Sequence, residues 1–309
     1  MPDNAKAVHA ALQHVPRFVG VKPDAYTSTR LGGLTNLVYR IEMADEKLIV
    51  RIPGEGTNEY IDRKVELHNA RIAAEAGVSA EILWADGVTG VMISQCIEPS
   101  ETMTPEGFKT RAGSPGRAGS ALAKLHGSGK VFQFRFELFA MIDDYLGVLA
   151  GKDTNLPDGY ADVVAAAQPV KAALAGNPTA LAPCHCDPLC ENFLDTDSAM
   201  WIVDWEYSGM NDPMWDLGDL SVEGGFDEAQ DLEMLRAYFG RDPSAAEMGR
   251  VVIYKAMCDL LWTLWGLIQH SDGNPAEDFW AYSVERFERC KTLMQSAGFE
   301  THIKAIGRP

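Results

Sequence analysis

The chain has 309 residues, of which 46% are hydrophobic, and its formal net charge at pH 7 is −17. This length is sufficient for one large domain or two moderate domains with a buried core, and the negative charge makes nucleic acid a poor partner. The start of the chain lacks a charged segment followed by an apolar one, so we expect a cytoplasmic protein with reduced cysteines. An acidic surface is compatible with a cationic small substrate, although solubility is the commoner cause.

The first hundred residues predict a small sheet with one main helix. Strand-like patterns are found over residues 37–42 with 47–52 and over 81–84 with 88–94. Helical patterns are found over residues 5–15 and about 59–76. The sheet pattern breaks between Ser94 and Pro99, so we expect a nucleotide-binding lobe over residues 1–97.

Two backbone segments of this lobe are candidates for nucleotide contacts. Gly32 and Gly33 precede the first clear strand and would let the backbone approach phosphate oxygens closely, although a tight turn is the commoner meaning of such a pair. Backbone groups from Gln95 to Ile97 could hydrogen-bond the edge of a nucleobase.

Arg51 lies late in the second strand between apolar residues, where a cation needs an acidic partner or a phosphate. Glu66 on the following helix is one such partner, and Glu55 and Glu59 compete with it. A strand cation paired with a helix carboxylate is the arrangement by which kinases orient the α- and β-phosphates of ATP.

Residues 98–309 predict a larger and mostly helical lobe. Helices are expected over residues 117–126, 136–150, 159–175 and 251–269, and a loop is expected between Pro105 and Gly116. In the apolar segment 251–269, Lys255 and Asp259 favour a buried helix over a membrane span. The segment from Gly127 to Lys130 looks like part of a P-loop but lacks its first glycine and its final Ser or Thr, so we interpret it as a helix end.

The segment from Cys184 to Glu223 carries the densest set of chemical groups. Asp187 is followed five residues later by Asn192, and a predicted hairpin would bring Asp204 back beside Asn192. Phosphoryl transfer needs a positioned base and metal ions that spread charge. Asp187 fits the base, and Asn192 and Asp204 supply the oxygen ligands that Mg²⁺ prefers.

Cysteines are concentrated around His185, at positions Cys184, Cys186 and Cys190. A zinc site is disfavoured because the C-x-C-x3-C spacing does not match the common structural zinc sites. The sequence assigns these cysteines no role. Asp216, further along the same segment, is expected to anchor the catalytic loop by bonding backbone N–H groups.

Several blocks of sequence, in order, resemble the aminoglycoside phosphotransferase and choline kinase group. H-x-D-x-x-x-x-N followed by IVDWEY carries this resemblance. The nearer similarity, to choline/ethanolamine kinases including bacterial ones, rests on LGGLTNLVYRI, LIVRI, LAKLHG, DWEYSGMNDPMWDLGDLSVE and LWTLWGLIQ. The resemblance covers most of residues 31–287. It implies an α+β, bilobal protein-kinase-like fold, with a small β-rich N-lobe containing one main helix and a larger, mostly helical C-lobe.

The resemblance also implies roles for particular residues, with ATP and Mg²⁺ as cofactors. Asp187 would be the catalytic base, and Asn192 and Asp204 would bind the metal. Residues 98–309 would form the catalytic and substrate-binding lobe. Nucleotide contacts are expected at Gly32, Gly33, Asn36, Arg51, Glu66, Gln95 and Ile97.

A cationic amino alcohol is the substrate that the resemblance implies. Choline carries a quaternary ammonium without hydrogen-bond donors, so aromatic faces and carboxylates must recognise it. In choline kinases, the residues that match Tyr207, Glu223, Trp262, Trp265 and Tyr282 line the choline site. Taken without the resemblance, tryptophans at helical spacing are more often core residues.

Other readings stay open at this point. The substrate could be choline or ethanolamine, and another amine or alcohol such as thiamine or an aminoglycoside is an alternative. An aminoglycoside carries several primary ammonium groups and would need several carboxylates. An inactive amine-binding module is a further alternative, against which the intact set of Asp187, Asn192 and Asp204 argues. The sequence does not indicate the oligomeric state.

Overall fold

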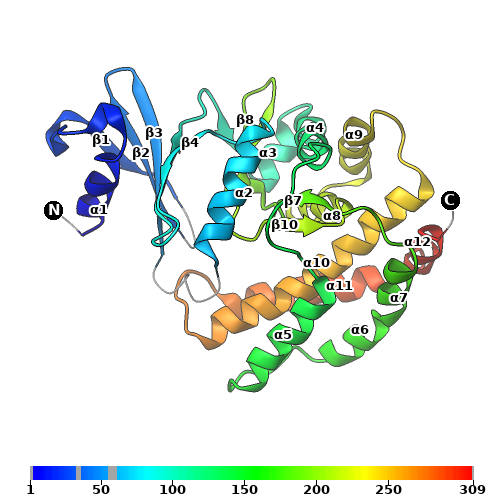
Figure 1. Cartoon of the computed structure of the whole chain (residues 1–309). Helices are drawn as coiled ribbons and strands as arrows, with labels where there is room; N and C mark the ends of the chain where they lie inside the picture. Colours follow the sequence, from blue (N-terminus) through cyan, green and yellow to red (C-terminus); the bar gives the residue numbers. More distant parts are fainter. Residues whose placement is uncertain (1–2, 33–35, 55–60, 308–309) are drawn as a thin grey trace.

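The N-terminal part of the protein is a five-stranded antiparallel sheet (Figure 1). The computed structural model describes residues 3–32, 36–54 and 61–307. The strands lie in the order β1–β2–β3–β5–β4. Their bounds are Thr27–Arg30 for β1, Asn36–Met43 for β2, Glu46–Pro53 for β3, Ile82–Ala85 for β4 and Met92–Gln95 for β5.

Helices cover both faces of this sheet. On one face lie α1 (Asp3–Leu12) and the short 3-10 helices η1 (Pro16–Phe18) and η2 (Pro23–Ala25), with Phe18 buried in the same apolar cluster as Val50 of β3. Because side chains alternate along a strand, Arg51 points to the other face. On that other face lies α2 (Arg63–Glu75). Asp62 is its N-cap, and the Asp62 carboxylate accepts two backbone N–H groups of the helix.

The C-terminal part is built around one long helix, α10 (Ala245–Ser271), which packs against α5, α8, α11 and α12 (Figure 1). Ser244 and Glu247 form a capping box that starts α10. The other helices of this part are α3 (Pro105–Thr110), α4 (Ser114–His126), α5 (Leu138–Ala150), α6 (Tyr160–Ala166), α7 (Gln168–Gly176), α8 (Met214–Glu223), α9 (Glu228–Phe239), α11 (Phe279–Met294) and α12 (Phe299–Ala305).

Two small antiparallel sheets carry the chemically dense segment. One pairs β7 (Ala182–Cys184) with β10 (Gly209–Asn211). The other joins β6 (Glu101–Thr102), β8 (Phe193–Asp195) and β9 (Met200–Ile202). A 3-10 helix, η4 (Cys190–Asn192), connects β7 to β8. The predicted hairpin before Asp204 is therefore confirmed as β8–β9.

Two glycines allow α8 and α11 to approach α10 closely. A Cβ on Gly218 of α8 would lie 2.8 Å from the Val251 carbonyl oxygen of α10. A Cβ on Gly266 of α10 would lie 2.4 Å from the Ser283 hydroxyl of α11. Atoms rarely approach this closely, so a larger residue at either position would push α8 or α11 away from α10.

The predicted α+β architecture, with a β-rich N-terminal region and a helical C-terminal region, is confirmed. The boundary after residue 97 stays a prediction. The loop expected between Pro105 and Gly116 is wrong, because Thr104 caps α3 and Pro105 occupies its first turn. The helix expected over residues 159–175 is two helices, because Pro169 lacks the N–H that would continue the ladder.

The strand β1 and part of the strand expected over 88–94 also differ from the prediction. All four side chains of β1 are exposed, so its sequence carries no apolar alternation. Residues 86–90 form a turn in which the Asp86 carboxylate accepts from the Val88 N–H and the Thr89 hydroxyl. The start expected for α2 at residue 59 lies outside the described residues.

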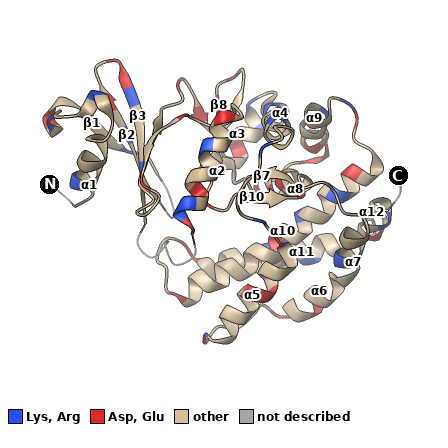
Figure 2. Ribbon diagram, in the orientation of Figure 1, with Lys and Arg blue, Asp and Glu red and all other residues tan. Residues whose placement is uncertain are grey.

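In the described part of the chain, α10 is long and apolar enough to cross a membrane, but 78% of its most apolar window is buried inside the protein. The predicted buried helix over residues 251–269 is thus confirmed. Figure 2 shows acidic residues spread over both the sheet-rich and the helical parts of the molecule, so the negative charge is not concentrated on one element.

Candidate active site

The loop after β7 is held in place by a buried carboxylate of α8. Asp216 accepts the backbone N–H groups of His185 at 2.7 Å and Cys186 at 2.9 Å, and its Oδ2 lies 2.9 Å from His126 Nε2. Asp216 is fully buried. The predicted anchoring role of Asp216 is confirmed. It fixes the two residues that precede Asp187.

Asp187 itself is half-buried and lies among negative charges. The Asn192 side chain donates its Nδ2 to the Asp187 carbonyl at 3.0 Å, which leaves the Asn192 amide oxygen for another partner. Burial raises the pKa of the Asp187 carboxyl well above its usual range, and Glu223, Asp204 and Glu206 raise it further, while Arg286 opposes them.

The hairpin β8–β9 returns the chain to this loop. The Val203 N–H donates to the Asn192 carbonyl at 2.9 Å, which places Asp204 directly beyond this contact. Asp204 has a φ of +66°, a left-handed conformation that is unfavourable for a residue with a side chain. Such strain is retained at functional sites when the surroundings over-determine the geometry.

The predicted ion pair between Arg51 and Glu66 is present, and Arg51 has a second partner. Its Nη2 pairs with Glu66 Oε1, and its Nη1 donates to Asp204 Oδ1 at 3.1 Å. Glu66 is 1% exposed, so this pair is buried under the sheet. The competing candidates Glu55 and Glu59 lie outside the described residues.

Two charged residues of this site were missed by sequence reasoning. Glu206 Oε2 accepts from Asn36 Nδ2 at 3.1 Å and lies 3.4 Å from Arg63 Nη1, and Arg63 also pairs with Glu66 at 2.8 Å. Two features of the sequence could have indicated them: Glu206 is the Glu of Asp-x-Glu in IVDWEY, and Arg63 lies one helical turn before Glu66.

Glu66, Asp204 and Glu206 form what we call the carboxylate cluster. Each offers an oxygen, and these oxygens lie within 4.8 Å of one another. Burial and then Glu206 raise the pKa of Asp204 to about 7, against the opposing charge of Arg51. Hard oxygen donors at this spacing suit Mg²⁺, and a cation would relieve the repulsion between the carboxylates.

The other predicted nucleotide-binding residues are placed as follows. Gly32 is exposed, with no atom of the described residues within 4 Å of the position of a Cβ, and Gly33 lies outside those residues. Asn36 is buried and contacts the carboxylate cluster. The N–H groups of Gln95 and Cys96 donate to the carbonyls of Glu81 and Lys47, so these two groups are not available to a nucleobase. The Ile97 carbonyl accepts from the Ser100 hydroxyl at 2.6 Å, and nucleobase contacts at Gln95 and Ile97 stay a prediction.

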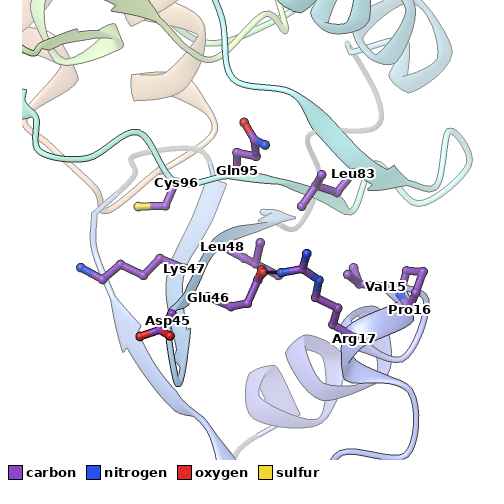
Figure 3. Close-up of a pocket in the computed structure, with 10 residues that line it drawn as sticks. All are labelled: Val15, Pro16, Arg17, Asp45, Glu46, Lys47, Leu48, Leu83, Gln95 and Cys96. Carbon is purple, nitrogen blue, oxygen red and sulfur yellow. Dashed lines mark ion pairs between the residues drawn. The ribbon is translucent and has the colours of Figure 1, made fainter.

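A cavity of about 560 Å³ adjoins Gln95 and Cys96 (Figure 3). Its other walls include Leu48 and the segment Val15–Arg17. Leu48 belongs to the apolar cluster under α1, whereas Arg51 faces away from that cluster. The cavity therefore lies on the far side of the sheet from the charged site.

The four aromatic residues predicted to bind the amine lie in one group, which we call the aromatic cluster. Its members are Tyr207, Trp262, Trp265 and Tyr282. Ring centroids are 5.5 Å apart for Tyr207 and Trp262, 6.4 Å for Trp262 and Trp265, and 5.9 Å for Trp265 and Tyr282. Trp262 is 4% exposed and belongs to the core, whereas Trp265 and Tyr282 are partly exposed.

Glu223 joins the aromatic cluster through an arginine that sequence reasoning missed. Arg286 of α11 holds Glu223 with two contacts of 2.6 and 2.9 Å, and its guanidinium lies 4.4 Å from the Tyr282 ring centroid. A second buried carboxylate, Asp219, accepts from Trp262 Nε1 at 3.4 Å. The Glu223–Arg286 pair and the Asp219–Trp262 hydrogen bond each join two helices, and the sequence offers no local signal for such contacts.

The cysteines around His185 are free and buried. His185 Nε2 bonds the Val203 carbonyl at 2.9 Å, and Cys184 lies beside His126 and Asp216. Groups of potential metal ligands in the described residues do not include Cys186 or Cys190. Burial raises the pKa of the Cys184 and Cys186 thiols well above the usual range, so both behave as core residues.

Comparison with known proteins places this chain in a family. A family model described as "Phosphotransferase enzyme family" matches residues 28–248. LicA of Haemophilus influenzae is 27% identical over 273 residues, which are 86% of this chain and 79% of that protein.

Solved structures that resemble this protein agree with the family match. A choline/ethanolamine kinase family protein from Mesorhizobium loti is 59% identical with a TM-score of 0.89, covering 97% of this chain and 98% of that one. The choline kinase LicA from Streptococcus pneumoniae is 26% identical with a TM-score of 0.78, covering 94% and 98%. A structure of LicA in complex with AMP has a TM-score of 0.72 at 26% identity, covering 93% and 98%. The resemblance inferred from sequence is confirmed. The chain belongs to the phosphotransferase enzyme family and, within it, to the choline/ethanolamine kinases.

Proposed function

We propose that the protein is an ATP- and Mg²⁺-dependent kinase that transfers the γ-phosphoryl group to the hydroxyl of choline or ethanolamine. The observation that carries this proposal is the position of Asp187 between the carboxylate cluster and the aromatic cluster. Besides burial, the charges that raise its pKa are those of Glu223, which Arg286 links to the Tyr282 ring, and of Asp204 and Glu206 in the carboxylate cluster. A base in that position is shared by a phosphate donor and an amine acceptor.

The carboxylate cluster and Arg51 form the donor side. Arg51 would bind the ATP phosphates, with Glu66 holding its guanidinium in place. Asn192 and Asp204 would bind Mg²⁺, and Glu206 adds a third oxygen donor close by. When bound, Mg²⁺ supplies positive charge to the phosphate oxygens.

The aromatic cluster and Glu223 form the acceptor side. Aromatic faces attract a quaternary or primary ammonium, each contact contributing roughly 0.5–2 kcal/mol. Trp265 and Tyr282 are the members that are partly open to a ligand. An ammonium held here would leave the hydroxyl two carbons away, and the charge of Asp187 acts on Tyr282 of this cluster.

Asp187 would take the proton from this hydroxyl. The hydroxyl oxygen bonds to the γ-phosphorus, the bond from that phosphorus to the β–γ bridging oxygen breaks, and ADP leaves. Because burial raises the pKa of the Asp187 carboxyl, its ionised form is a stronger base than a free aspartate. Asn192 fixes the Asp187 backbone, and Asp216 fixes the residues before it.

The cytoplasm is the proposed location, since ATP and reducing conditions are available there. All six cysteines are free, as a reducing compartment requires. An aminoglycoside carries several ammonium groups and would need several carboxylates, so it fits the acceptor side less well than a small amino alcohol with one positive charge. Glu223 is already paired with Arg286 and offers little to an additional ammonium group.

ADP release by the purified protein tests the proposal. The panel contains choline, ethanolamine, thiamine and two aminoglycosides, each with Mg²⁺ and with EDTA. We expect Mg²⁺-dependent release with choline or ethanolamine. Release with an aminoglycoside or thiamine instead would move the protein to another substrate, and no release with any compound would indicate an amine-binding module.

A further inference from the structure

A chain of side-chain hydrogen bonds connects helix α9 with the backbone that precedes the proposed catalytic base. Asp216 accepts the backbone N–H groups of His185 and Cys186. His126, the last residue of α4, lies with its Nε2 2.9 Å from Asp216 Oδ2. On the other side of the same ring, His126 Nδ1 lies 3.0 Å from the hydroxyl oxygen of Tyr238 on α9. We call Tyr238, His126 and Asp216 the relay.

The chemistry of these groups gives the relay a direction. The Asp216 carboxylate accepts hydrogen bonds and therefore requires a proton on His126 Nε2. With the proton on Nε2, the other ring nitrogen carries a lone pair, and the Tyr238 hydroxyl donates to it. Burial raises the pKa of the Tyr238 phenol, which keeps the donated proton on its oxygen. Each member of the relay thus donates to the next one.

Helix packing fixes the place of the Tyr238 hydroxyl. A Cβ on Gly119 of α4 would overlap the Met234 carbonyl oxygen of α9, so the glycine permits an approach that a larger residue would prevent. Tyr238 lies one helical turn after Met234, and its ring centroid is 5.6 Å from that of His126. The contact between tyrosine and histidine is therefore made by two helices that pack closely, and not by a surface loop.

The hydroxyl of Tyr238 selects one of the two orientations of the His126 ring. A histidine ring rotated by about 180° exchanges its nitrogens with ring carbons. In that orientation, Asp216 would face a C–H group instead of Nε2–H and would lose one of its three donors. The carboxylate would then hold the loop less firmly. Phosphoryl transfer depends on the alignment of the base, so a looser loop lowers the rate of the chemical step more than it lowers substrate binding.

We propose that Tyr238 is a positioning residue for phosphoryl transfer. Its hydroxyl orients the His126 ring, and the ring in turn orients Asp216. Asp216 holds the two backbone N–H groups that precede Asp187. The kinetic consequence rests on the proposed kinase activity, whereas the effect on those two N–H groups does not.

Tyr238→Phe tests the proposal, because it removes the hydroxyl and keeps the ring. Tyr160→Phe is the matched control, since the Tyr160 hydroxyl also bonds within the helical part but donates to the Leu260 carbonyl, at 2.7 Å. We expect kcat with choline or ethanolamine and Mg·ATP to fall about 3- to 10-fold in Tyr238→Phe, the scale of one hydrogen bond, with both KM values within about twofold of the wild type. In Tyr160→Phe, kcat should stay at the wild-type value. Equal losses of kcat in the two variants would overturn the positioning role.

Amide hydrogen exchange measures the loop itself. We expect the exchange rates of the His185 and Cys186 amides to rise at least about fivefold in Tyr238→Phe and to rise no more than the change in global stability requires in Tyr160→Phe. Unchanged exchange in Tyr238→Phe would overturn this inference and leave the proposed kinase activity intact. Absence of turnover in the wild-type protein would overturn the proposed function, and amide exchange would still decide whether Tyr238 positions the loop.

A double-variant cycle tests the path through His126. The amide nitrogen of a glutamine can replace His126 Nε2 as the donor to Asp216, but glutamine offers no acceptor in place of Nδ1. Adding Tyr238→Phe to His126→Gln should therefore lower kcat by less than about twofold. A further loss as large as that of Tyr238→Phe alone would overturn the path.

The tautomer of His126 can be measured in the wild-type protein from the chemical shifts of its ring nitrogens. We expect the proton on Nε2, with Nδ1 accepting from Tyr238. A proton on Nδ1 would overturn the direction of the relay. This measurement needs no substitution, so it decides even if a variant does not fold.

Discussion

Arg51 Nη1 donates to Asp204 Oδ1 at 3.1 Å, across 153 residues of sequence. This contact joins the N-terminal sheet to the loop that follows β9. Arg51 holds Glu66 with its other terminal nitrogen, so one guanidinium connects the sheet, α2 and the C-terminal part. The cation proposed to bind phosphate and the carboxylate proposed to bind metal are thereby positioned as one unit.

Replacing Arg51 by lysine tests this unit. We expect Arg51→Lys to lower kcat/KM for ATP at least about tenfold while KM for the amine changes little, because an ammonium cannot hold both carboxylates in a fork geometry. Steady-state kinetics with each substrate varied measure the effect. Arg40→Lys, on the neighbouring strand and 36% exposed, is the control. Equal effects on both substrates would assign Arg51 to general stability.

Asp187→Asn removes the proposed base and keeps the side-chain shape. We expect kcat to fall at least about 100-fold with little change in nucleotide binding, because the amide cannot accept the hydroxyl proton. Single-turnover kinetics and nucleotide titration separate the two quantities. Asp162→Asn, at an exposed position on α6, should behave as the wild type. Turnover near the wild-type level in Asp187→Asn would remove this residue from the proposed role.

Glu206→Gln tests the residue that the motif search did not single out. Glu206 shares the carboxylate cluster with Asp204 and Glu66, so we expect the Mg²⁺ concentration for half-maximal activity to rise about 10-fold or more. Isothermal titration with Mn²⁺ in place of Mg²⁺ provides a readout that does not depend on turnover. Exposed Glu191→Gln is the control, and an unaltered Mg²⁺ dependence in Glu206→Gln would leave Glu206 only its contacts with Arg63 and Asn36.

Trp265→Ala tests the acceptor side. Trp265 is partly exposed and contacts Tyr207, Trp262 and Tyr282, so we expect KM for the amine to rise about 5-fold or more while KM for ATP stays within twofold. Trp262→Ala should have the same kinetic direction but also destabilise the protein by about 3–5 kcal/mol, because Trp262 is buried. Trp280→Ala, 37% exposed, is the matched control. Equal changes in both KM values would favour core packing as the role of these tryptophans.

The start of α10 supplies a pH-dependent contribution to stability. Hydrogen bonds from Arg241 and the Ser244 N–H lower the pKa of Glu247 from its ordinary 4.5 to about 2. A lowered pKa stabilises the fold above about pH 4.5, and this stabilisation is lost as pH falls toward about 2.

Glu247→Gln should therefore lower the free energy of unfolding by about 1 kcal/mol at pH 7 and have no effect near pH 2. The value is kept small because the Arg241 side chain is 56% exposed and its charge is screened. Urea unfolding at several pH values provides the measurement. Glu300→Gln, in a pair with Lys304 at the surface, should change little at any pH. A pH-independent loss in Glu247→Gln would point to the capping hydrogen bond instead of the charge.

Short-range patterns in the sequence were sufficient to predict much of the fold and of the candidate site. Asp187, Asn192 and Asp204 lie within one segment, and turn chemistry predicted the hairpin that brings Asp204 back to Asn192. Alternating apolar residues predicted β2 and β3, since each pattern is a local consequence of strand geometry. Elements without such a pattern were missed: β1 is exposed along its whole length, and α3 is only one and a half turns long.

The tertiary structure decided which charged groups meet. Sequence reasoning left Arg51 with three acidic candidates, and it did not pair Glu206 with Arg63 or Glu223 with Arg286. Those partners lie on elements whose approach depends on helix packing, such as the close contacts at Gly218 and Gly266. Spacing along a chain determines which residues share a strand or a helix face, whereas the distance between two such faces depends on how the whole core is filled. The sequence by itself determined the family and the catalytic motif, and the fold decided which arginines, carboxylates and aromatic rings meet, such as Glu223 with Arg286 and Tyr282.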